Sequence, residues 1–388
     1  MMDFDNALQL MGEGSFVGDI ENIPIENALG RVLAESVTTP FDFPPFSKAA
    51  MDGYALSSRD PSERYRIVES IAAGSPPTKA IDVGLCSKIM TGAMMPEGAD
   101  KVIRVEYTEV EGDNMTPIRE ESGFNVIVQG ENAKMGDEVL DPRVLRPQDI
   151  GVLATLGKRE IGVVAPPRVG IINTGSELKE PGETLSGGEI FNSNGYQLCA
   201  QVAAINCPYR FYGIVEDKRD GLLKVIKAAL EECDIILLSG GVSMGDYDLV
   251  PDLLKEAGVE IIFHKMAIKP GKPTLYGRRE DRDVIGLPGN PVSTFVIFEV
   301  MVKSLIFSRM GLNYSPLIYR GILKDEIKRR DTSRLEFRPV RIDSEGIHGV
   351  TYRGSSHIHA LGEANGLLRI EVGKATLPVG TEVDVRQI

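Results

Sequence analysis

The stretch Asp234-Ile235-Ile236-Leu237-Leu238-Ser239-Gly240-Gly241 decides the fold, because a short apolar run ends there in a polar, glycine-containing turn. A run of this kind between turn residues is typical of a strand buried on both faces. Around it, apolar strand patterns alternate with helical patterns, from Val169 to Asn173 at one end to a long apolar helix over Val292 to Phe307 at the other. The alternation predicts a central, mainly parallel α/β sheet domain.

Within this region we predict five strands and four helices. The strands are Val169 to Asn173, Phe211 to Val215, Asp234 to Leu238, Ile261 to Ile268 and Val284 to Leu287. The helices are Tyr196 to Ile205, Leu222 to Leu230, Leu249 to Glu256 and Val292 to Phe307. Ligands of such sheets bind beyond the carboxyl ends of the strands, so the loops at that edge are the first candidates for a site.

The chain on either side of this region follows other patterns. Apolar residues at helical spacing predict helices between Asp3 and Val37, including a second run over Ala28 to Leu33, and again over Pro147 to Leu156. Between Phe41 and Asn132, short apolar runs separated by turn residues predict a small β-rich domain. Its clearest predicted strands are Tyr65 to Val68 and Lys101 to Val105.

After Tyr314 the chain is again rich in short strands. We predict them at Ile318 to Leu323, Leu335 to Ile342, Gly349 to Tyr352, Leu367 to Val372 and Thr381 to Val385. The expected layout is therefore a multidomain α/β plus β protein. It comprises a helical linking region at 1–45 and 133–166, a β-rich insert domain at 46–132, an α/β domain at 167–312 and a C-terminal β-barrel-like domain at 313–388.

Composition excludes several classes of function. With 388 residues the chain is too long for one ordinary core, and its net charge of -13 disfavours nucleic acid as a partner. Its four cysteines are far apart and predict reduced thiols. We found neither a basic, apolar leader nor an uninterrupted apolar run of membrane-spanning length, so we expect a cytoplasmic protein that does not contact membranes.

Three polar, glycine-containing loops follow strands of the predicted sheet. They are Thr174-Gly175-Ser176-Glu177, Ser239 to Asp248, and Pro288-Gly289-Asn290-Pro291. Glycines let backbone N–H groups approach a phosphate, and hydroxyl groups add donors. Each loop alone is as well explained as a turn, but three at one edge indicate a nucleotide-like or pterin-like phosphate. The binding candidates are Thr174, Gly175, Ser239, Gly240, Gly241, Ser243, Pro288, Gly289 and Asn290.

Carboxylates lie at the same edge. Asp246, Asp248 and Glu177 would face the phosphate, and carboxylates facing a phosphate need a hard cation between them. Mg²⁺ is the simplest choice, with Asp246 and Asp248 as its ligands. The alternative for these two aspartates is that they cap the following helix.

A basic segment follows in the same region. Lys265, Lys269 and Lys272 fall within eight residues of an acidic protein, around a Pro-Gly turn. Their ammonium groups could converge on a phosphate or another oxyanion. The alternative is a solvated basic edge, because lysines are mostly surface residues.

Two long loops of the β-rich region complete the set of candidates. One is Pro44-Pro45-Phe46-Ser47-Lys48-Ala49-Ala50-Met51-Asp52-Gly53-Tyr54, and the other runs from Ile89 through Thr91 to Asp100. Neither spacing specifies a reaction. An Asp-Gly pair usually means only a turn, so Asp52 is a weak candidate on this ground alone.

These two loops, together with Gly-Gly-Val-Ser-Met-Gly-Asp-Tyr-Asp, Ala-Ile-Lys-Pro-Gly-Lys-Pro and Gly-Leu-Pro-Gly-Asn-Pro-Val-Ser, resemble the molybdopterin molybdenumtransferase (MoeA) family, which includes the E domain of gephyrin. The resemblance extends in order over nearly the whole chain. It implies an elongated homodimer of four-domain subunits that inserts molybdate into adenylylated molybdopterin with metal-dependent release of AMP. It also implies that 167–312 is a molybdopterin-binding-like α/β domain, that the helical linking region is a dimerisation region, and that the site lies between the α/β domain and domains of the partner subunit.

The resemblance assigns roles that residue chemistry alone does not. By motif position, it makes Asp52, Thr91, Glu177, Asp248, Lys265 and Lys269 catalytic candidates, and it adds Lys272, Ser243 and Ser355 to the binding residues. The lysines would neutralise molybdate or phosphate, and Asp248 with Asp246 would hold Mg²⁺. Asp234 also matches a family position, but it lies at the start of a strand, where a structural role is at least as plausible. A molybdopterin adenylyltransferase and apo-molybdoenzymes are the partners that the resemblance implies.

The chain departs from the family pattern at three positions. Ile127 and Asn132 replace a cation and an acid, as if a charge pair had been lost together. Pro339 stands where many members have an arginine thought to meet the oxyanion, and Arg338 or Arg334 could substitute for it. These departures leave open whether the oxyanion is molybdate or tungstate. They also leave room for a non-catalytic molybdopterin carrier or scaffold, whereas an unrelated nucleotide-dependent enzyme would require the motifs to be coincidental.

Overall fold

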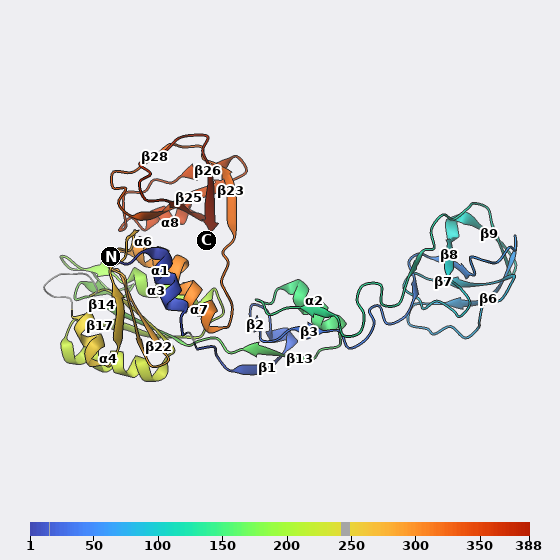
Figure 1. The fold of residues 1–388 in the computed structure, drawn as a ribbon, viewed down its shortest axis with the longest axis horizontal. Helices are drawn as coiled ribbons and strands as arrows, with labels where there is room; N and C mark the ends of the chain where they lie inside the picture. Colours follow the sequence, from blue (N-terminus) through green and yellow to red (C-terminus); the bar gives the residue numbers. More distant parts are fainter. Residues whose placement is uncertain (15, 242–248) are drawn as a thin grey trace. The chain divides into compact units, whose positions relative to one another are not determined.

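The computed structural model describes residues 1–14, 16–241 and 249–388, which divide into two compact units (Figure 1). The first unit comprises Met1–Ala34, Arg143–Ile150 and Glu160–Ile388, and the second comprises Glu35–Pro142 and Gly151–Arg159. Helix α2 (Pro147–Thr155) confirms the helix predicted from Pro147 to Leu156. The division between the two units falls within this helix, after Ile150.

The centre of the first unit is a six-stranded sheet in the order β17-β14-β18-β22-β21-β19. Its strands are β14 (Val169–Thr174), β17 (Tyr209–Val215), β18 (Ile235–Ser239), β19 (Glu260–His264), β21 (Leu275–Arg279) and β22 (Arg282–Leu287). The strands from β17 to β22 run parallel, whereas β21 pairs antiparallel with both β22 and β19. The predicted α/β sheet is thus present as a mixed sheet with a parallel core.

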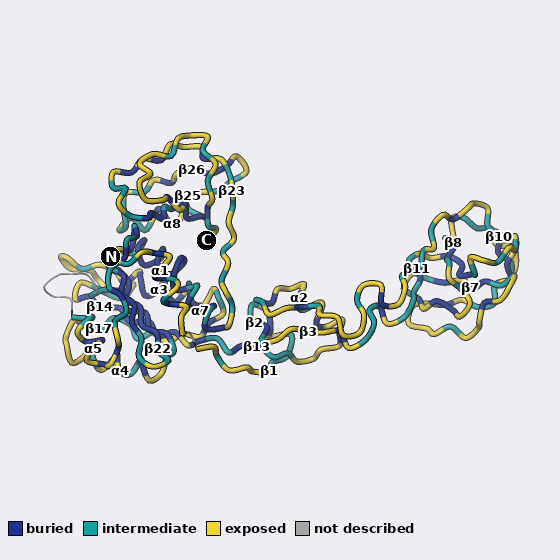
Figure 2. Tube along the Cα trace, in the orientation of Figure 1, coloured by how far each residue is buried: buried dark blue, intermediate teal, exposed yellow. Residues whose placement is uncertain are grey.

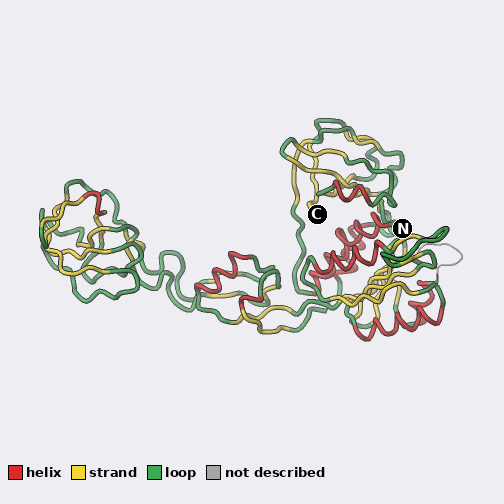
Figure 3. The backbone as a smooth tube through the Cα atoms, turned by 180° about the vertical axis from the view of Figure 1, so that it is seen from behind, coloured by secondary structure: helices red, strands yellow, loops and turns green. Residues whose placement is uncertain are grey.

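Helices cover both faces of this sheet, as Figure 3 shows. They are α1 (Phe4–Gly12), α3 (Ser193–Ala203), α4 (Arg219–Glu232), α5 (Val250–Glu256), α6 (Pro291–Ile297) and α7 (Lys303–Arg309). Alternate residues of β18 enter different clusters. Ile235 and Leu237 pack with residues of α1, α3 and α6, while Ile236 and Leu238 pack with those of α4 and α5. Both faces of the strand are therefore buried, as its continuous apolar run predicts (Figure 2).

A long helical segment ends the α/β region. It runs from Pro291 to Arg309 as α6, a π-helical stretch (Phe298–Val302) and α7. Among the described residues, it is the one helix long and apolar enough to span a membrane by length and composition, but 72% of its apolar window is buried inside the protein. Glu299 and Lys303, which interrupt the apolar run, form an ion pair of 3.2 Å. The segment therefore has the character of a core helix.

The C-terminal part of the first unit is a small sheet that closes on itself. Its strands are β20 (Ile268–Lys269), β23 (Ile318–Ile322), β25 (Leu335–Asp343), β26 (Gly346–Gly349), β27 (Gly366–Ile370) and β29 (Glu382–Gln387), accompanied by the pair β24 (Ile327–Lys328) and β28 (Thr376–Leu377) and by helix α8 (His359–Glu363). The order is β20-β25-β27-β29-β23, with β26 on β25. A bridge from Leu323 to Ile347 joins the end of β23 to β26. Four of the five predicted strands are confirmed. The strand predicted at Gly349 to Tyr352 is instead β26, which ends at Gly349.

The predicted strand Ile261 to Ile268 is wrong in its second half. The chain leaves the sheet after His264, because Lys265 adopts a left-handed backbone conformation with φ of 85°. It then forms β20, which pairs in parallel with β25 so that Lys269 lies opposite Glu336. This short strand connects the α/β region to the C-terminal sheet.

The N-terminal region is less helical than we predicted. After α1, the chain forms β1 (Ile20–Pro24), a single turn at Ile25–Asn27 and β2 (Val32–Leu33), and both strands pair with β13 (Glu160–Val164). The second predicted helix, over Ala28 to Leu33, is wrong. Gly30 adopts φ of 74°, and the N–H groups of Gly30 and Leu33 donate to the carbonyls of Leu145 and Arg143 at 2.8 and 2.9 Å. Hydrogen bonds to a distant segment of the chain therefore determine the local structure here, and the helical spacing of the apolar residues does not.

The second unit is built on a six-stranded sheet in the order β8-β5-β7-β6-β10-β9. The strands are β5 (Gly53–Leu56), β6 (Tyr65–Ile71), β7 (Leu85–Ile89), β8 (Lys101–Arg104), β9 (Thr108–Glu111) and β10 (Asn114–Pro117). Two separate pairs join β4 (Lys48–Ala49) to β11 (Val126–Ile127) and β3 (Val37–Thr38) to β12 (Glu138–Leu140). Both strands singled out in the sequence are confirmed here.

All four cysteines are buried and unpaired, as the sequence predicts. Burial raises the pKa of the Cys86 and Cys207 thiols to about 12, so that these thiols stay protonated at neutral pH.

Candidate functional site

A pocket of about 360 Å³ lies at the carboxyl ends of β14 and β18 and beside the loop that follows β22. Each of the three loops predicted from the sequence contributes to it. The predicted residues in its lining are Thr174, Glu177, Ser239, Gly240, Gly289 and Asn290. The short paired strands β15 (Leu178–Lys179) and β16 (Ile190–Phe191), the start of α3, and Ser356 and Ile358 of the C-terminal part also line it. The expectation that these loops share one edge is therefore met.

Glycine is required where the chain turns after β18. Gly240 has φ of 97°, and a Cβ atom built on it would lie 2.0 Å from the carbonyl oxygen of Thr174. Real Cβ contacts never come so close, so any side chain here would push the loops after β14 and β18 apart. Gly240 thus lets two strand ends approach each other at the pocket wall.

A buried amide ties two of the three loops together. The Asn194 side chain, at the start of α3, donates to Ser239 Oγ and to the carbonyl oxygen of Gly289, both at 2.8 Å. Its neighbour Asn192 caps α3 by accepting from the Gly195 N–H at 3.0 Å. Neither asparagine was among the sequence candidates. An Asn-Ser-Asn run before a helical pattern was the available signal, but it indicates a helix cap and gives no hint of the Gly289 contact.

An adjoining pocket of about 580 Å³ shares Glu177, Ile190, Gly289 and Asn290 with the first. It lies between the α/β region and the C-terminal sheet. Among the predicted residues it is lined by Glu177, Lys269, Lys272, Pro288, Gly289, Asn290 and Ser355. Ser293, Arg334, Tyr352 and Gly354 also line this pocket. For brevity we call it the cationic pocket, after Lys269, Lys272 and Arg334.

Lys269 is held in place by a buried carboxylate. Its Nζ atom lies 3.2 Å from Glu336 Oε2, and the Glu336 side chain is only 1% exposed. Arg329, whose side chain is also 1% exposed, lies 3.7 Å from the same carboxylate and donates to the carbonyl of Arg334 at 3.0 Å. Because Arg329 can balance Glu336, the positive charge of Lys269 remains available to a ligand in the pocket.

Of the two arginines that could stand in for Pro339, one lines the pocket and the other does not. Arg334 lines it and is oriented by Asp331, whose carboxylate accepts from Arg334 at 2.7 Å and from the Ser333 hydroxyl at 2.6 Å. These hydrogen bonds lower the pKa of Asp331, with that of Ser333 the largest contribution. Arg338 instead donates to the carbonyl of Lys328 at 3.3 Å and is absent from the lining.

The three lysines do not all converge. Lys269 and Lys272 line the cationic pocket, whereas Lys265 does not. The Lys265 backbone is tied elsewhere: its N–H donates to Thr274 and its carbonyl accepts from the Met2 N–H, both at 2.9 Å. The residue pattern does not distinguish Lys265 from the other two lysines, because no local pattern indicates the left-handed backbone conformation that Lys265 adopts.

Ser355 joins the C-terminal part to the start of α6. Its hydroxyl accepts a hydrogen bond from Asn290 Nδ2 at 2.9 Å, and its carbonyl accepts from the Val292 N–H at 3.0 Å. The serine that the resemblance singled out therefore meets the Pro288-Gly289-Asn290 loop directly, which brings the two predicted stretches to one place.

In the second unit, Asp52 and Thr91 contact each other although 39 residues separate them. Asp52 Oδ1 accepts from both the backbone N–H and the hydroxyl of Thr91, each at 2.7 Å. These bonds lower the pKa of Asp52, the backbone bond more than the hydroxyl bond. The pair gives Asp52 a contact beyond its own turn, and the catalytic role that the resemblance implies for it stays a prediction.

We expect Thr91→Val to raise the pKa of Asp52, because it removes the hydroxyl bond and keeps the backbone bond. A carboxylate whose pKa falls on folding favours the folded state above its unfolded pKa, and this contribution is lost as the pH drops through the folded value. The Thr91→Val variant should therefore have a smaller contribution and should lose the last of it at a higher pH, within the acidic range below about pH 4. Carboxyl-carbon NMR titration measures the pKa, and Thr91→Ser, which keeps a hydroxyl, is the control. An unchanged pKa in the valine variant would contradict the prediction.

The acidic candidates are only partly described. Ser243, Asp246 and Asp248 lie outside the described residues. Within the described ranges, no group of three His, Cys, Asp or Glu side chains could hold a metal ion. Glu177 lines both pockets, and no ion pair is formed by its carboxylate with the described residues. A carboxylate that forms no ion pair with these residues is the type of oxygen ligand that a hard cation such as Mg²⁺ takes.

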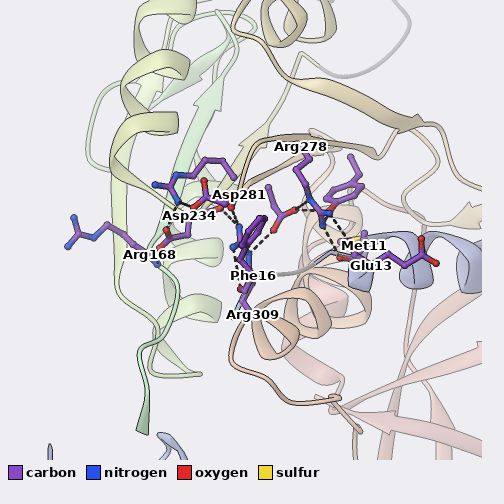
Figure 4. A network of polar contacts seen from close by, with 11 residues as sticks. Met11, Glu13, Phe16, Arg168, Asp234, Arg278, Asp281 and Arg309 are labelled. Atoms are coloured by element: carbon purple, nitrogen blue, oxygen red, sulfur yellow. Dashed lines mark hydrogen bonds and ion pairs between the residues drawn. The ribbon is translucent and has the colours of Figure 1, made fainter. Parts of the chain in front are cut away.

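Asp234 belongs to the other end of the sheet. Its carboxylate accepts from the Arg168 N–H at 2.8 Å and from Arg282 at 3.0 Å (Figure 4). These contacts fix the beginnings of β14, β18 and β22, away from both pockets. They favour the structural role that its position in the sequence indicates.

Comparison with known proteins covers the chain almost completely. The family model described as MoeA N-terminal region (domain I and II) matches residues 2–157, that of a probable molybdopterin binding domain matches 170–307, and that of the MoeA C-terminal region (domain IV) matches 320–388. Molybdopterin molybdenumtransferases of Staphylococcus epidermidis and Staphylococcus aureus are each 32% identical to this chain, over 94% of it and 90% of their own length.

Solved structures agree with the sequence relatives. A crystal structure of the molybdopterin biosynthesis MoeA protein from Pyrococcus horikoshii OT3 is 30% identical, covers all of both chains and has a TM-score of 0.88. A second structure of the protein from this organism is 29% identical over all of this chain and 99% of that chain, with a TM-score of 0.83. Sequence profile, relatives and fold coincide over the same residues, and the chain therefore belongs to the MoeA family of molybdopterin molybdenumtransferases.

Proposed function

We propose that this chain inserts molybdate into adenylylated molybdopterin and releases AMP in a Mg²⁺-dependent reaction. The observation that carries the proposal is the cationic pocket: a protein of net charge -13 gathers Lys269, Lys272 and Arg334 around one cavity. Such a gathering attracts a dianion and keeps it in place. The adjoining polar pocket at the strand ends suits the pterin and phosphate part of the substrate.

Each group has a proposed task. Lys269, Lys272 and Arg334 would bind the oxyanion, with Ser355 beside it, and the loops at Thr174, Ser239 and Gly289 would hold the organic part of the substrate. The catalytic proposal also keeps Asp52, Thr91, Glu177 and Lys265 as candidates. Asp246 and Asp248 would hold Mg²⁺, which when bound neutralises phosphate charge.

The cellular location, the oligomeric state and the partners of the protein are part of the same proposal. We expect a cytoplasmic homodimer that receives its substrate from a molybdopterin adenylyltransferase and passes its product to apo-molybdoenzymes. Tungstate has the same tetrahedral shape and charge as molybdate, and nothing in the cationic pocket separates the two. A side-by-side assay with both anions is therefore part of the test.

The test is a direct assay of turnover. Purified chain, adenylylated molybdopterin, Mg²⁺ and molybdate are mixed, and AMP release and reconstitution of a cofactor-free molybdenum oxidoreductase are followed. We expect both signals, each dependent on molybdate. Ligand binding without AMP release would instead favour the non-catalytic carrier, and absence of binding and turnover would overturn the proposal.

A further inference from the structure

Tyr352 is a member of the cationic pocket that no motif pointed to. It lines the cavity with Lys269, Lys272, Arg334 and Ser355, and its side chain is half-buried. Arg338 lies over its ring with the guanidinium carbon 5.9 Å from the ring centre, and the ring packs against the main hydrophobic cluster. Among the residues that the structure describes, no hydrogen bond is formed by the Tyr352 hydroxyl. The ring is thus held while its hydroxyl remains free to bind.

The Tyr352 phenol stays neutral in this pocket. Burial, and secondarily the negative charge of Glu336, raise the pKa of Tyr352 to about 12, while Arg338 opposes the shift. The hydroxyl therefore remains protonated at neutral pH and can donate a hydrogen bond. Tyr352 lines the same pocket as Lys269, whose Nζ lies 3.2 Å from Glu336 Oε2.

We propose that Tyr352 Oη donates a hydrogen bond to the tetrahedral oxyanion that Lys269 and Lys272 bind, and so acts as a catalytic residue that contacts substrate. The proposal rests on the function proposed above and adds a residue to its oxyanion site. Hydrogen bonds from a neutral donor to an ionised acceptor are stronger than neutral pairs. A hydroxyl also adds a contact without adding a further positive charge beside Arg329, Lys269 and Arg334.

The shared chemistry is a tetrahedral oxyanion, and its two possible sources are free molybdate and the phosphoryl group of the substrate. Two calorimetric titrations distinguish these sources. One uses molybdate alone and the other uses AMP alone, each with the full-length wild-type chain and with Tyr352→Phe. The variant removes one oxygen atom that has no partner among the described residues, so we expect it to fold normally, which thermal unfolding checks.

The expected result is molybdate binding weakened by about tenfold in Tyr352→Phe, as for loss of a hydrogen bond to a charged group. Tyr319→Phe is the matched control. Tyr319 lies in the same C-terminal part outside the pocket lining, and its variant should bind like the wild type. If AMP binding weakens and molybdate binding does not, the contact is to the phosphoryl group, and the oxyanion in the proposal is that phosphoryl group.

Two other outcomes separate failure of this inference from failure of the proposed function. If the wild type binds molybdate and Tyr352→Phe binds both ligands equally well, Tyr352 has no such contact and only this inference is overturned. If the wild type binds neither molybdate nor AMP, the assignment of the cationic pocket is itself wrong, and the inference falls with it.

Discussion

Lys269→Met lowers the rate of AMP release by roughly 10²- to 10³-fold, the loss expected when a preorganised positive group is removed from a site where charge must be stabilised. Methionine keeps the length and apolar stem of lysine and removes only the ammonium group. The loss should be this large because Lys269 is already oriented: Glu336 holds its Nζ at 3.2 Å before any ligand arrives. A positioned charge stabilises the reacting oxyanion without a further cost of reorganisation.

The variant is also expected to fold. Glu336 keeps Arg329 at 3.7 Å as a counterion, so removal of Lys269 does not leave an isolated buried carboxylate. Thermal unfolding separates a loss of activity from a loss of structure. Lys224→Met, on the exposed surface of α4, is the control for removal of a lysine charge and should leave the rate unchanged.

The division between binding and rate identifies the role of Lys269. If it binds the oxyanion in both the ground state and the transition state, molybdate affinity and AMP release fall together. If it acts chiefly in the transition state, molybdate affinity changes little while the rate at saturating molybdate falls. A folded Lys269→Met variant with wild-type rate and affinity would contradict the whole assignment of the cationic pocket.

A strand could be predicted from the sequence where its own residues form a short apolar run. β14 begins with Val169-Gly170-Ile171-Ile172 and β18 with Ile235-Ile236-Leu237-Leu238, and a short, nearly continuous apolar run that ends in turn residues is typical of a strand buried on both faces. β21 was missed because Gly277, Arg278 and Arg279 interrupt its apolar pattern. It is stabilised instead by antiparallel pairing with β22, which depends on the tight turn at Glu280 with φ of 53°.

The site was predictable only at its sheet edge. The loops containing Thr174, Ser239 and Gly289 follow strands, so general rules for α/β sheets bring them together. The other half of the site comes from the C-terminal sheet, and its residues meet Lys269 through the pairing of β20 with β25. No local pattern encodes that pairing, which explains why Tyr352 was missed and why Arg334 and Arg338 could not be told apart.

A second large effect is expected on stability, from Asp283→Asn. Asp283 is 1% exposed and accepts from Tyr276 at 2.7 Å, from Arg278 Nε at 2.9 Å and from Arg309 Nε at 2.9 Å. Asparagine would remove the charge that both arginines need and would turn an amide N–H₂ group toward one of the three donors. Removal of one member of a buried ion pair costs about 3–5 kcal/mol.

The cost should spread beyond the pair, because the two arginines also hold the N-terminal segment (Figure 4). Arg278 donates to the carbonyls of Glu13 and Met11 at 2.7 and 3.3 Å, and Arg309 donates to the carbonyl of Phe16 at 3.4 Å. Asp283 orients both guanidinium groups for these bonds. We therefore expect the variant to expose the segment that follows α1 to proteolysis before the unit unfolds.

Urea unfolding followed by circular dichroism measures the first effect, since the chain has no tryptophan to report by fluorescence. The control is Asp281→Asn, two residues away in the same network. Asp281 pairs with Arg282 at 2.8 Å but its side chain is 41% exposed, so its replacement should cost no more than about 1 kcal/mol. Equal losses in the two variants would mean that burial does not determine the strength of this network, and a stable, protease-resistant Asp283→Asn protein would show that the arginines hold the N-terminal segment without their carboxylate.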